Sequence, residues 1–151
     1  MQALRIAAGL LRTLRPQAQA YLPAASSKAQ RALLETAGFA LSGSFYLPGQ
    51  PANAAFPAML ATLCRIPPSS VVMMHTSIRK EPGGYTREQW SVLADACKAM
   101  RHFPILEISS RGLYRAGRDS AAVHGMVERE APFMLMHLGV GRIAISVCDK
   151  L

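Results

Sequence analysis

The stretch FPILEISSRGLYRAG, residues 103–117, combines a short apolar run with a carboxylate, and it determines how the rest of the chain is interpreted. Pro104, Ile105 and Leu106 predict a buried strand, and Glu107 follows them at the start of a polar segment punctuated by glycine. In a parallel α/β sheet, ligands bind in the crevice beyond the carboxyl ends of the strands. Glu107 is therefore a candidate site residue.

Strand and helix patterns alternate along the whole sequence. Helices are expected at residues 3–14, from Ser26 or Ser27 to Gly38, from Pro57 to about Arg65, from Thr86 to about Arg101, and at residues 119–130. Strands are expected at residues 20–22, 39–46, 71–74, 103–108, 133–136 and 143–147. This alternation predicts the α/β class, with a mainly parallel sheet in a three-layer α/β/α arrangement. We expect a single domain over residues 1–151.

Several helix boundaries carry recognisable signals. Thr86 and Gln89 have the spacing of a capping box, and Gly38 is suited to end a helix in a left-handed conformation. Pro57 suits the first turn of a helix. Residues 47–54 are rich in Pro, Gly and Asn and predict an irregular loop.

Composition narrows the class of protein without identifying it. Half of the 151 residues are hydrophobic, and 17 basic residues face 9 acidic ones. The arginines are scattered, so nucleic-acid binding is not favoured, although a basic adaptor for nucleic acid or anionic surfaces stays an alternative. No apolar run approaches the roughly 20 residues of a membrane-spanning helix. Residues 1–15 contain no acid and could resemble a targeting or interfacial helix, but we favour a helix packed on the sheet.

The cysteines and histidines show no metal-binding pattern. Cys64, Cys97 and Cys148 are scattered, without the spacing of metal ligands. An odd number of cysteines without a signal peptide indicates reduced thiols, and we expect a cytoplasmic location. We therefore expect no metal cofactor.

Three further elements could join Glu107 at the strand ends. His75 ends the strand at residues 71–74, Pro82-Gly83-Gly84 predicts a turn, and Arg142 follows Gly-Val-Gly. An anion pocket could also draw on nearby arginines, which are Arg111, Arg115 and Arg118. Two alternatives stay open: Glu107 as a solvated or salt-bridged acid, for instance paired with a nearby arginine, and His75 as a structural histidine satisfied by backbone.

Five motifs, in order, resemble one enzyme family. They are Ala3-Leu4-Arg5, LLETAGF at residues 33–39, SSVVMMH at residues 69–75, TREQW at residues 86–90, and PILEI at residues 104–108. Together they resemble the large domain of the class I aminotransferases, the aspartate and aromatic amino-acid group of pyridoxal-phosphate-dependent fold type I. The resemblance is nearly continuous over residues 3–147. It implies that residues 3–14 belong to the domain.

The resemblance implies roles for several positions. Glu107 takes the place of the family's Asp that pairs with the pyridine nitrogen of pyridoxal phosphate, a pairing that keeps the ring electron-withdrawing. Ser110 stands for a Tyr that contacts the ring hydroxyl, and Glu81 for the Asn of an Asn-Pro-Thr-Gly loop. His75 is kept, and Arg142 corresponds to an arginine that holds the phosphate.

The resemblance also implies changes at the positions where the family's side chains stack on the cofactor ring. The family's ring-stacking Trp becomes Ser27, and the His soon after it becomes Gln30. These substitutions remove an aromatic surface and a ring nitrogen, so the implied site is degenerate. Pyridoxal phosphate stays a candidate cofactor by resemblance alone.

The family's Schiff-base lysine has no counterpart, so no catalytic residue is assigned. The matching stretch, residues 133–142, reads FMLMHLGVGR and contains no lysine. The sequence also begins after the family's phosphate-binding glycine loop and ends before its small domain. We therefore expect a truncated aminotransferase-like domain that is inactive as an isolated chain. The alternative is an amino-acid aminotransferase whose site is completed by another chain.

Partners follow from the expected fold. A parallel sheet needs cover on both faces, and a part of the large domain would leave apolar surface exposed. We expect a homo-oligomer or a complex with another aminotransferase-like chain.

Overall fold

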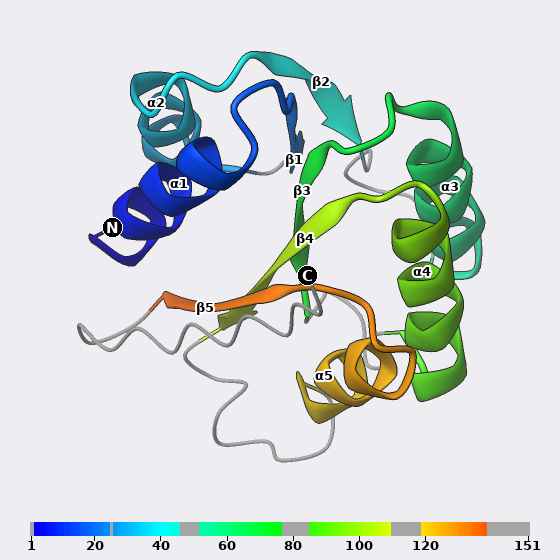
Figure 1. Ribbon diagram of the computed structural model, residues 1–151. Helices are drawn as coiled ribbons and strands as arrows, with labels where there is room; N and C mark the ends of the chain where they lie inside the picture. The colour runs from blue at the N-terminus through cyan, green and yellow to red at the C-terminus, as the bar shows by residue number, and fades with distance from the viewer. Residues whose placement is uncertain (1, 25, 46–51, 77–84, 110–118, 139–151) are drawn as a thin grey trace.

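The computed structural model describes residues 2–24, 26–45, 52–76, 85–109 and 119–138. Its helices are α1 (Gln2–Leu14), α2 (Lys28–Thr36), α3 (Ala52–Arg65), α4 (Arg87–Ala99) and α5 (Asp119–Glu128). Its strands are β1 (Ala20–Pro23), β2 (Leu41–Phe45), β3 (Val71–His75), β4 (Phe103–Ser109) and β5 (Met134–Leu138). The strands form one sheet in the order β2-β1-β3-β4-β5, and every neighbouring pair is parallel (Figure 1).

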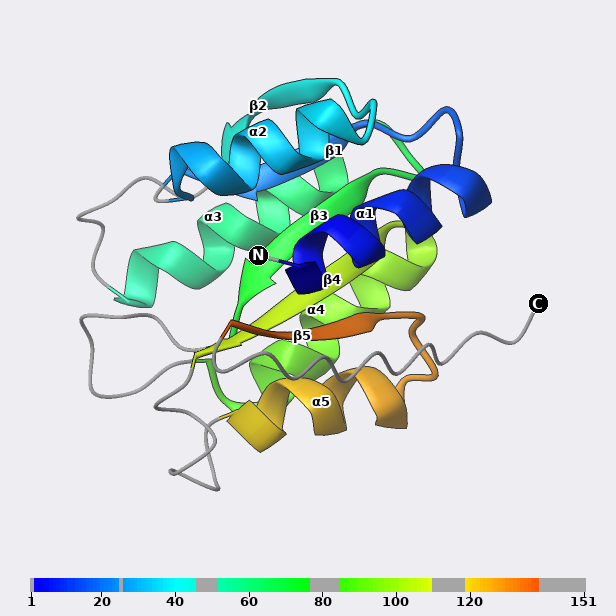
Figure 2. The ribbon, with the colours of Figure 1, turned by 90° about the vertical axis from the view of Figure 1, so that its left-hand side faces the viewer.

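Helices cover both faces of this sheet. Helices α1 and α2 lie on one face, and α3, α4 and α5 lie on the other (Figures 1 and 2). Strand β3 shows why, because its side chains alternate between two cores. Val71 and Met73 pack in the core under α1 and α2, whereas Val72 and Met74 pack in the core under α3, α4 and α5. The predicted three-layer α/β/α class with a mainly parallel sheet is confirmed.

Local signals set the ends of two helices. Ser27 caps α2 and Thr86 caps α4, each in a complete capping box closed by Gln30 or Gln89. Gly38 follows the end of α2 with a φ of 89°, the left-handed conformation that favours glycine. The chain can then turn directly into β2.

One boundary was predicted incorrectly. Helix α3 begins at Ala52, inside the segment expected to be an irregular loop, and Pro57 lies in the helix interior rather than in its first turn. A proline at the sixth position removes one internal hydrogen bond but leaves the rest of the helix intact. Packing of Ala55, Met59 and Leu63 against the sheet supports the longer helix.

The expected strand at residues 143–147 lies outside the described residues. Within the described ranges, no helix combines the length and apolar character needed to cross a membrane.

Candidate functional site

His75 and Glu107 meet at the carboxyl ends of two adjacent strands. They are paired in register across β3 and β4, and the Nδ1 atom of His75 lies 2.9 Å from the Oε2 atom of Glu107. Both side chains project to the face that carries α1 and α2, because they follow the alternation of Met73 and Ile105 in the core on that face. Parallel strands in register thus bring an acid and an imidazole together.

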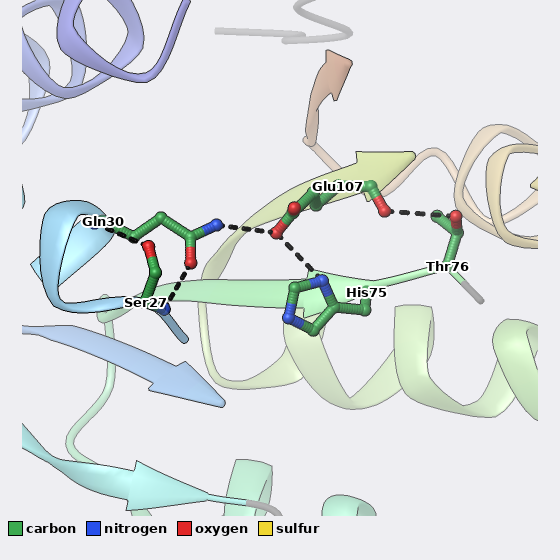
Figure 3. A network of polar contacts seen from close by, with 5 residues as sticks. All are labelled: Ser27, Gln30, His75, Thr76 and Glu107. Carbon is green, nitrogen blue, oxygen red and sulfur yellow. Dashed lines mark hydrogen bonds and ion pairs between the residues drawn. The ribbon is translucent and has the colours of Figure 1, made fainter. Parts of the chain in front are cut away.

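A third side chain reaches Glu107 from α2. The Nε2 atom of Gln30 donates a hydrogen bond to Oε2 of Glu107 at 3.2 Å (Figure 3). The other end of the same amide closes the capping box, since Oε1 of Gln30 accepts from the backbone N–H of Ser27 at 2.8 Å. The start of α2 therefore fixes the orientation of Gln30, and Gln30 and His75 together fix the Glu107 carboxylate.

Thr76 binds the main chain of Glu107 next to these side-chain contacts. Its N–H and its Oγ1 both donate to the carbonyl oxygen of Glu107, at 3.0 and 3.2 Å. Because these bonds act on the main chain, the end of β4 is tied to the end of β3 whatever the Glu107 side chain does.

The contacts span the point where the strand order reverses. From β1 the chain moves to one side of the sheet to form β2, and it then returns to build β3, β4 and β5 on the other side. Gln30 follows β1, whereas His75 ends β3 and Glu107 lies near the end of β4, which closes at Ser109 (Figure 3). Such a switch point is the usual place for a ligand in an open α/β sheet.

Two of the candidate residues, His75 and Glu107, are brought into contact. Ser27 lies near them as the exposed cap of α2, where its backbone N–H holds the amide of Gln30. The remaining candidates, Glu81, Ser110 and Arg142, lie outside the described residues, as do the arginines Arg111, Arg115 and Arg118.

Among the described residues, Glu107 is paired with an imidazole and an amide and not with an arginine. The residue is only 8% exposed, and its side-chain partners among the described residues are His75 and Gln30. For His75, the partner of the Nδ1 atom is this carboxylate.

Gln30 was not predicted to be a site residue. Two features of the sequence pointed to Gln30. One is the capping-box spacing of Ser27 and Gln30, and the other is that Gln30 stands at the position of the family's histidine. The capping box alone gave no reason to expect contact with a residue 77 positions away.

One oxygen of the Glu107 carboxylate and one buried hydroxyl leave capacity for a ligand on this side of the fold. Both contacts to the Glu107 carboxylate use Oε2, and none of the described residues contacts Oε1. The Oγ atom of Ser26, just before the α2 cap, is also buried without a hydrogen-bond partner among the described residues. An unpartnered carboxylate oxygen fits a ring N–H donor, so the described residues suit the pyridine-nitrogen side of pyridoxal phosphate.

The described residues include two lysines, Lys28 and Lys98. Lys98 lies in the last turn of α4, where its Nζ atom donates to the carbonyl of Arg129. Since α4 begins at the carboxyl edge of the sheet, its last turn lies at the opposite edge. Lys28 is exposed at the first position of α2 beside Ser27, and sequence reasoning had overlooked it.

Among the described residues, no three His, Cys, Asp or Glu side chains gather in a way that could hold a metal ion.

Fold and site together define an α/β protein with a preassembled acid–imidazole–amide contact at the switch point of a parallel sheet. No family model matches the chain. An aspartate aminotransferase of Pseudomonas aeruginosa is 28% identical over 121 residues, which cover 80% of this chain and 30% of that protein.

Solved structures agree with this similarity. An aromatic amino acid aminotransferase of Burkholderia cenocepacia matches with a TM-score of 0.72 and 26% identity, over 89% of this chain and 34% of that one. The aromatic-amino-acid aminotransferase of Burkholderia pseudomallei, solved covalently bound to pyridoxal phosphate, matches with a TM-score of 0.72 and 30% identity over the same shares. The predicted resemblance to the class I aminotransferases is therefore confirmed. The chain spans about a third of the length of these relatives.

Proposed function

We propose that the protein is an aminotransferase-like domain, formed by residues 1–151, that binds pyridoxal phosphate without a covalent link and does not catalyse transamination as an isolated chain. The observation that carries this proposal is the Glu107 carboxylate, which is buried, held by two side chains, and left with one oxygen that no described residue contacts. The similarity to a structure with bound pyridoxal phosphate supports the choice of ligand.

Each residue of the contact has a definite role in this proposal. Glu107 accepts the ring N–H of the cofactor through Oε1. His75 and Gln30 hold Oε2, so that the carboxylate does not rotate away. When bound, pyridoxal phosphate supplies an electron-withdrawing pyridinium ring.

The absence of a lysine within residues 133–142 supports the non-covalent part of the proposal. An amine is needed to link the cofactor to the protein and to move protons during transamination. The proposed partner is a second copy of the chain or another aminotransferase-like chain. A chain that supplies a lysine would convert the domain into part of a complete enzyme.

The test is a titration with pyridoxal phosphate, followed by absorbance, with borohydride reduction and peptide mass spectrometry at saturation. We expect saturable binding, no specific adduct, and no conversion of aspartate or aromatic amino acids with a keto-acid acceptor. Glu107→Gln should weaken binding roughly 10-fold or more, because a hydrogen bond to a charged group contributes about 1.5–3 kcal/mol.

The matched control is Glu35→Gln, which changes an exposed glutamate on α2 and should leave binding unchanged. Equal affinities for wild type and Glu107→Gln would contradict the assignment of Glu107. A stoichiometric adduct on one lysine, for instance Lys28, would contradict non-covalent binding. The absence of any binding would leave only the aminotransferase-like scaffold.

A further inference from the structure

The described part of the candidate site is built around one acceptor atom, the Oε1 atom of Glu107. Both side-chain contacts to the carboxylate use the other oxygen, Oε2, and the dashed lines from Gln30 and His75 in Figure 3 end on that same atom. In the proposed function, Oε1 accepts the ring N–H of pyridoxal phosphate. The ligand is therefore anchored at its ring nitrogen.

This anchor is buried and is held in place before any ligand binds. Glu107 is 8% exposed and Gln30 is 6% exposed. The capping box fixes the amide of Gln30, because its Oε1 accepts from the backbone N–H of Ser27 at 2.8 Å. Thr76 ties the main chain of Glu107 to the end of β3. A preorganised acceptor contributes the same affinity for every ligand that offers it a matching N–H.

The chemistry of the ligand determines which molecules offer that N–H. In pyridoxal phosphate, the ring nitrogen lies opposite the carbon that carries the aldehyde. The amine and alcohol forms, pyridoxamine phosphate and pyridoxine phosphate, keep the nitrogen, the ring hydroxyl and the phosphate, and they differ from the aldehyde form only at that opposite carbon. The hydrogen bond to Glu107 is therefore available to all three forms.

A lysine is the group that would make a protein of this kind prefer the aldehyde. An amine that condenses with the aldehyde adds a covalent bond, which the amine and alcohol forms cannot make. Residues 133–142 contain no lysine. Lys98 donates to the carbonyl of Arg129 at 3.0 Å, away from the site, and Lys28 is exposed on the first turn of α2. The matching stretch thus lacks the amine that would select the aldehyde.

We infer that the site binds pyridoxal, pyridoxamine and pyridoxine phosphates with similar affinity, because it holds the ring nitrogen and does not bond to the group on the opposite carbon. The inference rests on the proposed function, since it requires the same Glu107 anchor, and it names the class of ligand that this anchor accepts. A domain with this specificity takes up the cofactor in any of the three forms and releases it unchanged.

Equilibrium dialysis of the whole chain against each of the three phosphates tests the inference. The alcohol form is the sharpest probe, because it cannot react with any lysine. We expect the three dissociation constants to agree within about 5-fold. Binding of the aldehyde form without binding of the alcohol form would overturn the inference and leave the proposed function standing. If none of the three binds, both fail.

Glu107→Gln should weaken binding of all three forms by the same factor, roughly 10-fold or more. Benzyl phosphate is the matched control ligand, since it carries a ring and a phosphate but no ring nitrogen. It should bind more weakly than pyridoxine phosphate, and Glu107→Gln should not change its affinity. A loss that differs strongly among the three forms would show that the protein also contacts the opposite carbon, and the inference would be wrong.

Gln30→Leu tests the same point without altering the acid. It removes the amide that holds Oε2 together with one bond of the α2 capping box. Gln89→Leu is the matched control, because it removes the equivalent bond from the α4 capping box. Gln30→Leu should weaken binding of the three forms equally, whereas Gln89→Leu should leave all three affinities unchanged. A loss confined to the aldehyde form would overturn the inference.

Lys28→Arg examines the exposed amine nearest to the Ser27 cap. The change keeps the positive charge but replaces the amine with a guanidinium group, which does not take the part of a lysine in condensing with the aldehyde. The affinity for pyridoxal phosphate should be the same in the variant and in wild type. A fall in that affinity, with pyridoxine phosphate unaffected, would show that Lys28 selects the aldehyde, which contradicts the inference.

Discussion

Gln30 and Glu107 are 77 positions apart in the sequence, and their side chains meet at 3.2 Å. The contact joins the first turn of α2 to the end of β4, and it leaves the amide of Gln30 to serve both the helix cap and the buried carboxylate.

Because Gln30 makes both contacts, we expect Gln30→Glu to lower the free energy of unfolding at neutral pH by about 1–3 kcal/mol. The buried Glu107 carboxylate would lose a hydrogen-bond donor and would face a like charge. The helix cap itself would survive, since glutamate also serves at the third position of a capping box. Urea unfolding at neutral pH measures the change.

Gln89→Glu is the matched control for Gln30→Glu. Gln89 closes the same kind of box on α4, and its side chain bonds there to the backbone N–H of Thr86. An acid near a helix N-terminus is stabilising by about 0.3–1 kcal/mol, so this variant should be neutral or slightly more stable. Equal losses in both variants would show that the contact with Glu107 contributes nothing.

Because His102 is buried, we expect the free energy of unfolding to decrease as the pH is lowered. Its Nε2 donates to the carbonyl of Leu63 at 2.8 Å, and its Nδ1 accepts from the backbone N–H of Ser70 at 3.3 Å. Burial, with a smaller contribution from the nearby Arg15 charge, lowers the pKa of His102 below its ordinary value of 6.5, although the Leu63 contact opposes the change.

As the pH falls through 6.5, His102 is therefore protonated in the unfolded chain before it is protonated in the folded protein. The free energy of unfolding should drop by up to about 1.4 kcal/mol per pH unit for one proton. His102→Gln should flatten that slope, although it lowers stability at neutral pH. The exposed His124 gives the control, as His124→Gln should keep the wild-type slope. An unchanged slope in His102→Gln would contradict this origin of acid sensitivity.

The two described cysteines should differ sharply in reactivity. Burial, with a smaller contribution from Cys64, raises the pKa of Cys97 to about 12, whereas Cys64 is exposed. The thiolate is the reactive form, so that iodoacetamide under mildly alkaline conditions should label Cys64 and spare Cys97 in the folded protein. Peptide mass spectrometry with and without urea checks this, and similar native labelling of both sites would count against it.

Gly125 is expected to be the least replaceable of the described glycines. A Cβ at Gly125 would lie 2.8 Å from the Cβ of Trp90 and 2.9 Å from its carbonyl carbon, where α5 crosses closely over α4. Gly125→Ala should therefore destabilise the protein by about 1–3 kcal/mol.

Gly9→Ala is the opposite case, although the chemical change is the same. It adds a methyl group in open space on a helix and should stabilise the protein by about 0.5–1 kcal/mol. Thermal unfolding of the two variants, compared at low protein concentration, tests the pair. A stable Gly125→Ala would mean that α4 and α5 can separate without loss.

Much of the fold could be predicted because its determinants are local. Thr86 and Gln89 specify the start of α4 by chemistry within one turn, and the run at residues 71–74 specifies a strand covered on both faces. Pro57 misled the prediction because its usual place at a helix start was outweighed by apolar packing of the turns around it.

The site was only partly predictable for a related reason. Parallel strands that are adjacent end at one edge, so His75 and Glu107 could lie near each other, but strand order and register decide whether they touch. Gln30 belongs to a third element, and its contact depends on how α2 rests on the sheet. Such a relationship is tertiary, and no local pattern encodes it.

The reversal of strand order at β1 and β3 has a consequence for how the molecule assembles. The contact between Gln30 and Glu107 bridges that seam, so it requires the segments on both sides to be in place. A ligand that needs it would bind only the complete molecule and, by mass action, would protect distant amide hydrogens in β2 and β5 alike from exchange.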